Sequence, residues 1–374
     1  MAHFLRLCVL SLLITLGQAA LALEPLRVLT WEGYVQAEDV KAVNALLTTK
    51  NLPYYVEVIK PYAEGAEQMF DLIRGQYCDV SFLTLFFIKI EKEQTARLLQ
   101  PINQNSPHLS NYSDLLSNLI QLDMGLDNQQ NPLYIPWGGG VYGFYIDYNK
   151  LGADEVPKSV KELWHEKWRG RFSLNKTQAG YNFGLALMSL GKSPFHLYHL
   201  IQQGSREELK ALMHPEGRLQ VQLNLLYQNA GNLWTSATEF HPELSIVSSW
   251  GPEIQAKNEA GGDWRLIKFE EGQMVWLDTI NFVKHLKGEK LAAAEVFANY
   301  FIGKKVQDRI ADELSMMPAL PAANKNSDLG QMQELYQEPM FVPPYDEVTY
   351  GIIKKMANVA EQSRLKRNGL LEVD

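Results

Sequence analysis

The first quarter of the chain alternates between two hydrophobic patterns, one typical of buried strands and one typical of amphipathic helices. Short apolar runs predict strands over 26–30, 55–59 and 78–84. Between them, apolar residues at helical spacing predict helices over 39–48 and 66–75. This alternation is typical of consecutive βαβ units, so the pattern predicts an α/β fold with a parallel sheet.

The pattern changes in the middle of the chain. Residues 103–131 are rich in Asn, Gln, Ser and Asp, and residues 134–147 then read as an aromatic strand interrupted by glycines. Glycines inside a strand mark a bend or a close approach of two backbones, so we expect the chain to cross from one lobe to another here. Helices are predicted over 183–190 and 207–213, and a strand over 245–249.

The last third predicts a return to the first lobe. A strand over 274–280 is expected to be the return crossing, and helices are expected over 291–302 and 305–313. A Pro/Ala stretch over 317–323 precedes a last helical segment. These patterns predict a signal peptide over 1–22, lobe 1 over 23–135 plus about 276–322, and lobe 2 over 136–275 plus about 323–374.

The N-terminus predicts export. Arg6 supplies a positive charge, the run Leu7–Leu16 is apolar, and Ala20-Leu21-Ala22 has the small residues of a cleavage site. An uncleaved anchor is the alternative, although the apolar run is shorter than the ~20 residues of a membrane span. A cleaved signal places the protein in the periplasm. Cys78 is then the one remaining cysteine, at the start of a strand, and we expect it to be a small buried residue.

Length and charge narrow the function. After removal of the signal, about 350 residues remain, which favours two domains over a single core. The formal net charge is −8 with mixed signs, which argues against nucleic acid and anionic membranes as partners. A negative protein attracts cations.

Large aromatic residues stand at the ends of three predicted strands, two of them followed by a carboxylate. In open α/β sheets, ligands bind beyond the carboxyl ends of the strands, so these residues are candidates for a cleft. Each tryptophan could instead belong to a core. The residues are Trp31 and Tyr34 after the first strand, Trp250 and Glu253 after the strand over 245–249, and Trp276 and Asp278 in the strand over 274–280.

This set suits an organic cation. Tryptophan faces attract cations by ~0.5–2 kcal/mol, and a buried carboxylate accepts charge-assisted hydrogen bonds from an ammonium group. Asp278 is the sharpest candidate, because a charge between Val275, Trp276 and Ile280 needs a partner. The alternative partner for Asp278 is a lysine or arginine of the protein itself.

Enzymatic motifs are absent from the sequence. It contains no Gly-x-Ser-x-Gly elbow, no phosphate loop and no His-Glu-x-x-His zinc motif. His196 and His199 could share a helix face, but two histidines make a weak metal site. We therefore expect no catalytic activity, no metal and no cofactor.

Taken together, the motifs resemble those of the periplasmic polyamine-binding proteins, the spermidine/putrescine receptors of ABC importers. The resemblance spans nearly the whole mature chain and rests on the order and spacing of several short motifs. These are Trp31-Glu32-Gly33-Tyr34, Cys78-Asp79-Val80 leading to Thr84 and Phe86, Ser159-Val160-Lys161-Glu162-Leu163-Trp164 followed by Gly170, Trp250 with Glu253, and Trp276-Leu277-Asp278.

The resemblance implies a fold and a set of binding roles. The fold would be the two-lobed type II periplasmic-binding-protein fold, in which each lobe is a mostly parallel sheet flanked by helices and the ligand lies in the cleft between them. Trp31, Tyr34, Thr84 and Phe86 would line the cleft, Trp250 and Trp276 would hold the methylene chain, and Glu253 and Asp278 would meet amines.

One loop departs from the family pattern. The family has acidic residues after the strand at Phe172-Ser173-Leu174, whereas residues 175–182 here contain no carboxylate. Two explanations are open. The ligand could be a different polyamine held by neutral acceptors and Tyr181, or it could be something other than a diamine.

We therefore expect a monomeric binding protein that delivers a polyamine of the spermidine, putrescine or norspermidine type to an ABC permease. Two alternatives stay open. The protein could be a sensor subunit that docks on the periplasmic domain of a membrane receptor. It could also bind another solute, such as an amino-acid derivative, an anion or ferric iron.

Overall fold

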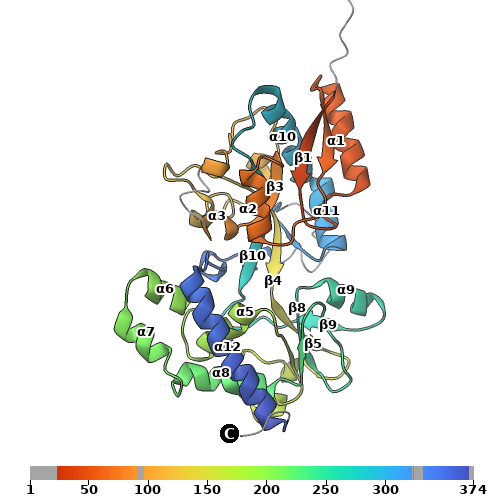
Figure 1. Ribbon diagram of the computed structural model, residues 1–374. Coiled ribbons are helices and arrows are strands. Elements are labelled where there is room, and N and C mark those ends of the chain that lie inside the picture. Colours follow the sequence, from red (N-terminus) through yellow and green to blue (C-terminus); the bar gives the residue numbers. More distant parts are fainter. Residues whose placement is uncertain (1–22, 91–96, 322, 324–331, 370–374) are drawn as a thin grey trace, which may run out of the picture.

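The molecule consists of two lobes joined at a waist (Figure 1). The computed structural model describes residues 23–90, 97–321, 323 and 332–369. The predicted signal peptide, 1–22, lies outside the described residues. Strands β4 and β10 run through the waist, and helices surround a sheet in each lobe (Figure 1). None of the described helices combines the length and the apolar character that a membrane crossing demands.

Lobe 1 is built on a six-stranded sheet with the strand order β11-β4-β10-β3-β1-β2. Its strands are β1 (Glu24–Leu29), β2 (Tyr54–Val58), β3 (Val80–Thr84), β4 (Ile135–Val141), β10 (Val275–Phe282) and β11 (Met317–Pro318). Its helices are α1 (Ala37–Thr49), α2 (Ala66–Arg74), α3 (Phe87–Ile90), α10 (Gly288–Phe301) and α11 (Lys304–Glu313). The predicted elements of this lobe are confirmed to within a few residues at each end.

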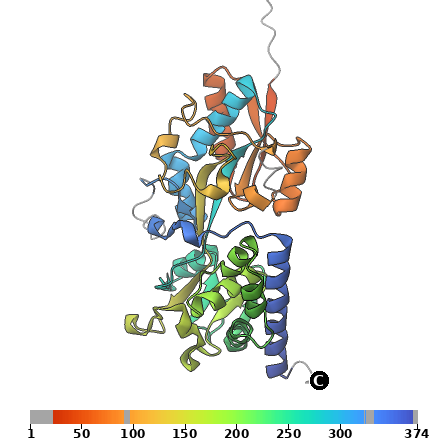
Figure 2. The ribbon, with the colours of Figure 1, turned by 90° about the vertical axis from the view of Figure 1, so that its left-hand side faces the viewer.

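Lobe 2 contains a three-stranded sheet, β8-β5-β9, and a parallel pair, β6-β7, joined to it by a bridge between Phe172 and Ile246. Its strands are β5 (Gly143–Asp147), β6 (Ser173–Asn175), β7 (Asn232–Trp234), β8 (Ile246–Ser249) and β9 (Trp264–Leu266). Its helices are α5 (Ala179–Ser189), α6 (His196–Gln202), α7 (Arg206–Leu212), α8 (Arg218–Asn229), α9 (Pro252–Glu259) and α12 (Glu347–Arg367). Helix α12 lies along one side of the lobe (Figure 2).

Short 3-10 turns connect these elements in both lobes. They are η1 (Tyr112–Asp114), η2 (Asp123–Gly125), η3 (Ala153–Glu155), η4 (Val160–Trp164), η5 (Glu166–Trp168), η7 (Gln333–Leu335) and η8 (Glu338–Met340).

The two-lobed α/β architecture agrees with the expectation, but the strand directions are more mixed than a mostly parallel sheet. Strands β1, β2 and β3 are parallel, as the βαβ pattern predicts. Strand β10 is antiparallel to both β3 and β4, and β5 is antiparallel to β8 and β9. The cause is the repeated crossing between lobes, because a strand that returns through the waist enters the sheet in the opposite direction.

The glycine-rich strand is divided between the two sheets at Tyr142. Strand β4 pairs with β10 in lobe 1, and β5 pairs with β8 in lobe 2. A Cβ atom on Gly139 would lie 2.1 Å from the carbonyl oxygen of Trp276. The glycines therefore permit the close backbone approach that the sequence predicts, and they bring β4 against the strand that carries Asp278.

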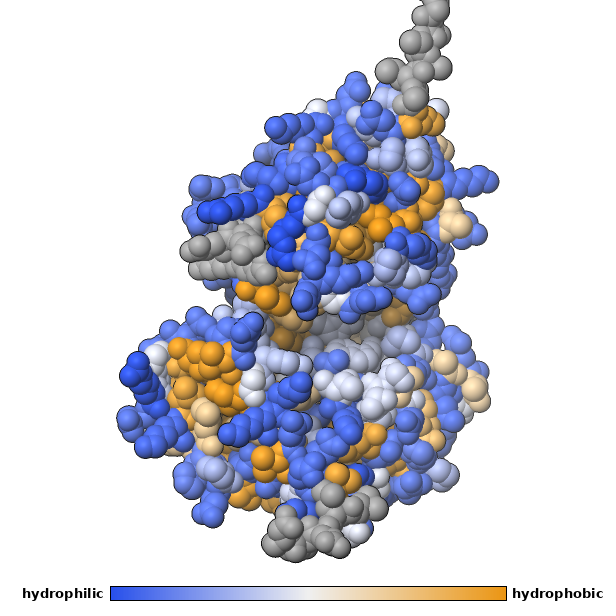
Figure 3. Space-filling model, viewed as in Figure 1, coloured by the Kyte–Doolittle hydropathy of each residue, from blue (hydrophilic) through white to orange (hydrophobic). Residues whose placement is uncertain are grey.

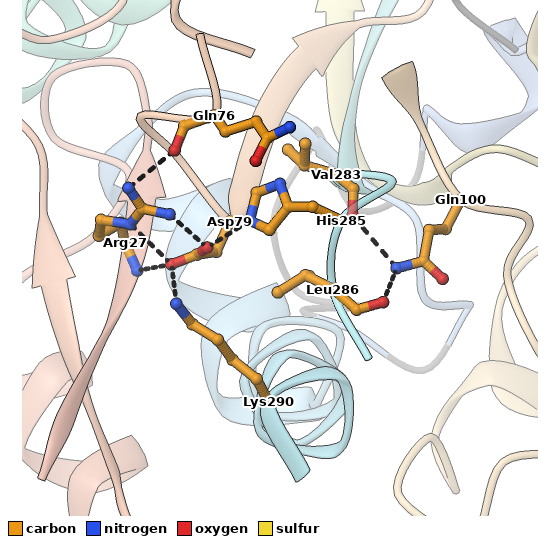
Figure 4. A network of polar contacts seen from close by, with 8 residues as sticks. All are labelled: Arg27, Gln76, Asp79, Gln100, Val283, His285, Leu286 and Lys290. Atoms are coloured by element: carbon orange, nitrogen blue, oxygen red, sulfur yellow. Dashed lines mark hydrogen bonds and ion pairs between the residues drawn. The ribbon is translucent and has the colours of Figure 1, made fainter. Parts of the chain in front are cut away.

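A buried charge network in lobe 1 is centred on Asp79 (Figure 4). The Asp79 carboxylate is fully buried and accepts from Arg27 Nε at 3.0 Å, His285 Nε2 at 2.8 Å and Lys290 Nζ at 3.0 Å. Burial by itself would raise the Asp79 pKa, but the hydrogen bonds from Arg27, His285 and Lys290 together lower it to about 2. Asp79 precedes β3, whereas Thr84 ends it, so the network holds the strand register from the far end.

Candidate ligand-binding site

The Asp278 carboxylate lies where three strands meet at the waist. Strand register places Asp278 opposite Thr84 of β3 on one side and Gly138 of β4 on the other. The Thr84 hydroxyl donates to Oδ1 of Asp278 at 2.6 Å, and the Tyr34 hydroxyl donates to Oδ2. Three predicted residues from separate strand ends thus share one hydrogen-bonded group.

The partners of Asp278 are hydroxyl groups rather than cations. Asp278 is 3% exposed, and no salt bridge between described residues includes it. Burial raises the Asp278 pKa to about 6, and the hydrogen bonds from Thr84 and Tyr34 partly oppose that rise. Burial and the neighbouring Asp278 charge also raise the Tyr34 pKa, so the phenol keeps its proton and remains a donor. The internal salt bridge that the sequence left open is not formed with any described lysine or arginine.

Four aromatic rings gather beside this carboxylate at the junction of the lobes. Tyr142 lies 5.0 Å from Tyr181 and 5.1 Å from Trp250, measured between ring centroids. Trp250 lies 5.2 Å from Tyr181 and 6.4 Å from Trp276. We call Tyr142, Tyr181, Trp250 and Trp276 the aromatic cluster. The indole nitrogen of Trp276 is buried without a hydrogen-bond partner among the described residues.

Trp31 and Glu253 lie apart from this group and have partners of their own. The indole nitrogen of Trp31 donates to the carbonyl oxygen of Phe82 at 2.9 Å, and its ring contacts Phe87. Glu253 is in the first turn of α9, where its Oε2 accepts from Ser249 Oγ at 3.2 Å. Thr238 Oγ1 lies 3.4 Å from the same oxygen. The structure therefore connects Glu253 with hydroxyl groups of lobe 2 rather than with Asp278.

A cavity of about 630 Å³ lies beside the aromatic cluster, in the region where the surface is hollowed between the lobes (Figure 3). Two predicted residues, Phe86 and Tyr181, line it. Phe86 packs edge-on against Phe87, with ring centroids 4.8 Å apart. The remaining apolar lining comes from both lobes and consists of Phe87, Ile90, Phe195, Met274, Val342, Tyr345 and Tyr350.

The loop after β6 forms part of the cavity wall without contributing a charge. Thr177 and Gln178 line the cavity, and their backbone N–H groups donate to the Asn175 side-chain oxygen at 2.7 and 3.2 Å. Asn182 is buried, and its Nδ2 donates to the Asn175 carbonyl and to the Tyr227 hydroxyl. Amide groups thus fix a loop that contains no carboxylate.

Sequence reasoning missed three acidic residues on this cavity and one member of the aromatic cluster. Glu67, Asp346 and Glu347 line the cavity. The sequence signal that could have indicated two of these acids is the run Tyr345-Asp346-Glu347 at the start of the last helix. Tyr142 was hidden because the glycine-rich strand was read as continuous, whereas the change of sheet occurs at that residue.

No metal-binding group of three or more His, Cys, Asp or Glu side chains occurs among the described residues. The carboxylates of Asp278 and Glu253 instead accept hydrogen bonds from hydroxyl groups. A buried acid beside aromatic rings is suited to binding an organic ammonium group, because the rings attract the cation and the acid pairs with it.

Solved structures share this fold over most of the chain. The spermidine/putrescine ABC transporter substrate-binding protein PotD of Streptococcus pneumoniae is 16% identical, with a TM-score of 0.68 over 91% of this chain and 99% of that one. The TpPotD lipoprotein of Treponema pallidum is 13% identical, with a TM-score of 0.63 over 91% and 100%. The apo ferric ion-binding protein A of Pasteurella haemolytica is 13% identical, with a TM-score of 0.54 over 92% and 97%.

These likenesses confirm the predicted type II periplasmic-binding-protein fold. No curated protein matches the sequence. A family model described as bacterial extracellular solute-binding protein matches residues 82–348, which include most of both lobes. Proteins of this family bind a small-molecule solute. The chain belongs to the bacterial extracellular solute-binding protein family.

Proposed function

We propose that this protein is a periplasmic binding protein for a polyamine of the spermidine, putrescine or norspermidine type, which it delivers to an ABC importer. The observation that carries the proposal is Asp278, a buried carboxylate with hydroxyl partners and no cationic partner among the described residues. A buried carboxylate that ionises needs a positive partner, and an ammonium group of the ligand would supply it.

The aromatic cluster supports the same ligand class. Trp250 and Trp276 belong to different lobes, and their ring centroids lie 6.4 Å apart. In the proposed complex these rings separate to receive the methylene chain, and Asp278 takes one ammonium group. Tyr34 and Thr84 bind the Asp278 carboxylate, and Phe86 and Tyr181 line the neighbouring cavity. Trp31 and Glu253 lie apart from this group and are assigned no contact with the ligand.

Isothermal titration calorimetry tests this proposal directly. Putrescine, spermidine and norspermidine are titrated into the protein beside glutamate, a divalent metal and ferric citrate. We expect a polyamine to bind and Asp278→Asn to weaken it about 30-fold or more, as loss of one partner of a buried charged pair does. Asp147→Asn is the matched control, because Asp147 is also buried but lies in the sheet of lobe 2.

Two results would overturn the assignment. One is binding of glutamate or a metal with no polyamine binding, which would assign the cleft to a different solute. The other is a polyamine affinity that is equal in the Asp278→Asn and Asp147→Asn variants, which would place the ammonium group elsewhere.

A further inference from the structure

Three carboxylates line the same cavity as Tyr181 and come from both lobes. Glu67 is in the first turn of α2 in lobe 1, and Asp346 and Glu347 stand at the start of α12 in lobe 2. The described residues that line the cavity include no lysine and no arginine. The charged side chains on its lining are therefore all acidic, and they approach the cavity from both lobes.

Helix geometry accounts for part of this arrangement but not for all of it. Acidic residues are favourable in the first turn of a helix, and Asp346 caps α12 by accepting from the Thr349 N–H at 2.6 Å. That role explains why each acid stands at a helix start. It does not require that two helices from different lobes direct their acidic starts toward one aromatic cavity.

The Tyr181 hydroxyl is an independent sign of a ligand in this cavity. Tyr181 is 8% exposed and lines the cavity, yet its hydroxyl has no hydrogen-bond partner among the described residues. The hydroxyl oxygen is not among the fully buried unpaired atoms of the described residues, so it is open to the cavity and available to a bound molecule. Burial, Tyr345 and Asp278 all raise the Tyr181 pKa, because the phenol stands near both groups. Tyr181 is thus close both to the Asp278 carboxylate and to Tyr345, which lines the cavity.

We propose that Glu67, Asp346 and Glu347, which we call the outer acids, form a second cation subsite with Tyr181 and Tyr345. This subsite takes the distal ammonium group of a linear polyamine whose other end pairs with Asp278. The inference rests on the proposed function and deepens it, because it assigns the ligand class as dications or higher rather than simple amines. The outer acids do not form a metal-binding group, which favours an extended organic cation over a metal ion.

The same arrangement couples the ligand to closure of the cleft. Glu67 is carried by lobe 1 and the other two outer acids by lobe 2, so closing the cleft brings like charges toward each other. Without a ligand this repulsion opposes closure. A bound ammonium group removes it, and the second charge of the ligand then favours the closed form.

The test compares a diamine with a monoamine of the same chain length in the full mature protein. Putrescine and butylamine are titrated into the wild type, the triple variant Glu67→Gln/Asp346→Asn/Glu347→Gln and the control Glu207→Gln. Asparagine also caps helices, so Asp346→Asn removes the charge but keeps the start of α12. Glu207 is the matched control, because it is an acid in the first turn of α7 outside the cavity.

We expect the triple variant to bind putrescine about tenfold more weakly than the wild type, since exposed ion pairs each contribute a few-fold. Butylamine affinity should change less than about twofold. Higher salt should weaken putrescine binding in the wild type and less so in the variant. If the triple variant does not fold, Glu67→Gln alone carries the test with an expected loss of about threefold.

The outcomes separate this inference from the function on which it rests. If wild-type protein binds putrescine and the triple variant matches Glu207→Gln, the outer subsite is refuted while polyamine binding stands. If the wild type binds neither putrescine nor spermidine nor norspermidine, the proposed function fails and the subsite fails with it.

Discussion

Replacing Asp278 by asparagine should make the ligand-free protein more stable while it weakens ligand binding. Asp278 is 3% exposed and has only hydroxyl donors as hydrogen-bond partners among the described residues. Its ionised form is therefore held in an environment that favours the neutral acid. An amide has nearly the same shape as the carboxylate and carries no charge, so it escapes this cost.

The magnitude follows from the pKa. Burial raises the Asp278 pKa from its ordinary value of 3.8 to about 6, and a shift of about two units corresponds to ~3 kcal/mol. Because the folded state holds the proton more tightly than the unfolded state, this group favours folding most below pH 3.8. That contribution falls as the pH rises toward about 6, and above this value ionised Asp278 destabilises the fold by the full amount.

Urea denaturation of wild type and Asp278→Asn between pH 4 and pH 8 measures this effect. We expect the variant to gain about 1–3 kcal/mol in free energy of unfolding at pH 7.5, because the buried charge is gone. The gain does not exceed ~3 kcal/mol, because asparagine keeps only one of the two acceptor oxygens. The difference between the two proteins should shrink toward pH 4. Putrescine binding by the wild type should also weaken below about pH 6, since the cation must displace a proton from Asp278.

A variant that is less stable than the wild type at every pH would refute this reasoning. It would mean that the hydrogen bonds from Tyr34 and Thr84 to the carboxylate exceed its cost of burial. A stability difference that does not change with pH would refute it as well, because the linkage argument requires that difference to depend on proton binding.

Three further variants test the framework around the site. Asp79→Asn should lower the free energy of unfolding by about 3 kcal/mol in urea denaturation, because Arg27, Lys290 and His285 lose their buried carboxylate partner. Gly139→Ala should lower the melting temperature sharply, because its Cβ would meet the Trp276 carbonyl, whereas Gly65→Ala should not. Gln255→Ala removes hydrogen bonds to Asp312 and Ser315 across the lobes, so small-angle scattering should show a larger radius of gyration.

The sequence predicted the parts of the fold that depend on local patterns. The elements of lobe 1 show clear periodicity, and their strands end where aromatic residues and acids begin. The meeting of Tyr34 with Thr84 was within reach for this reason, since parallel strands bring their carboxyl ends to one edge. Asp278 joins them because the antiparallel strand β10 enters the sheet at that same edge. Strand direction was less accessible, because β10 is buried along nearly its whole length and such a run does not specify a parallel or an antiparallel neighbour.

The parts that could not be predicted depend on contacts between distant segments. Glu253 lies close to Trp250 in sequence, yet α9 directs its carboxylate to Ser249 and Thr238. The outer acids were missed because Glu67 and Asp346 are separated by most of the chain. Only the docking of α12 on lobe 2 brings the second of these to the cavity.

The position of the acidic residues changes what the absence of a carboxylate from the loop over 175–182 implies. Taken alone, a loop without acids argues for a ligand with fewer charges than a polyamine. The cavity that this loop borders is nevertheless acidic, because α2 and α12 supply the carboxylates. A loop acid would be rigidly placed within lobe 2, whereas the outer acids are divided between the lobes. Their attraction for a cation therefore depends on how far the cleft has closed. Charge recognition and closure would then be one event, which favours ligands long enough to reach from Asp278 to the rim of the cavity.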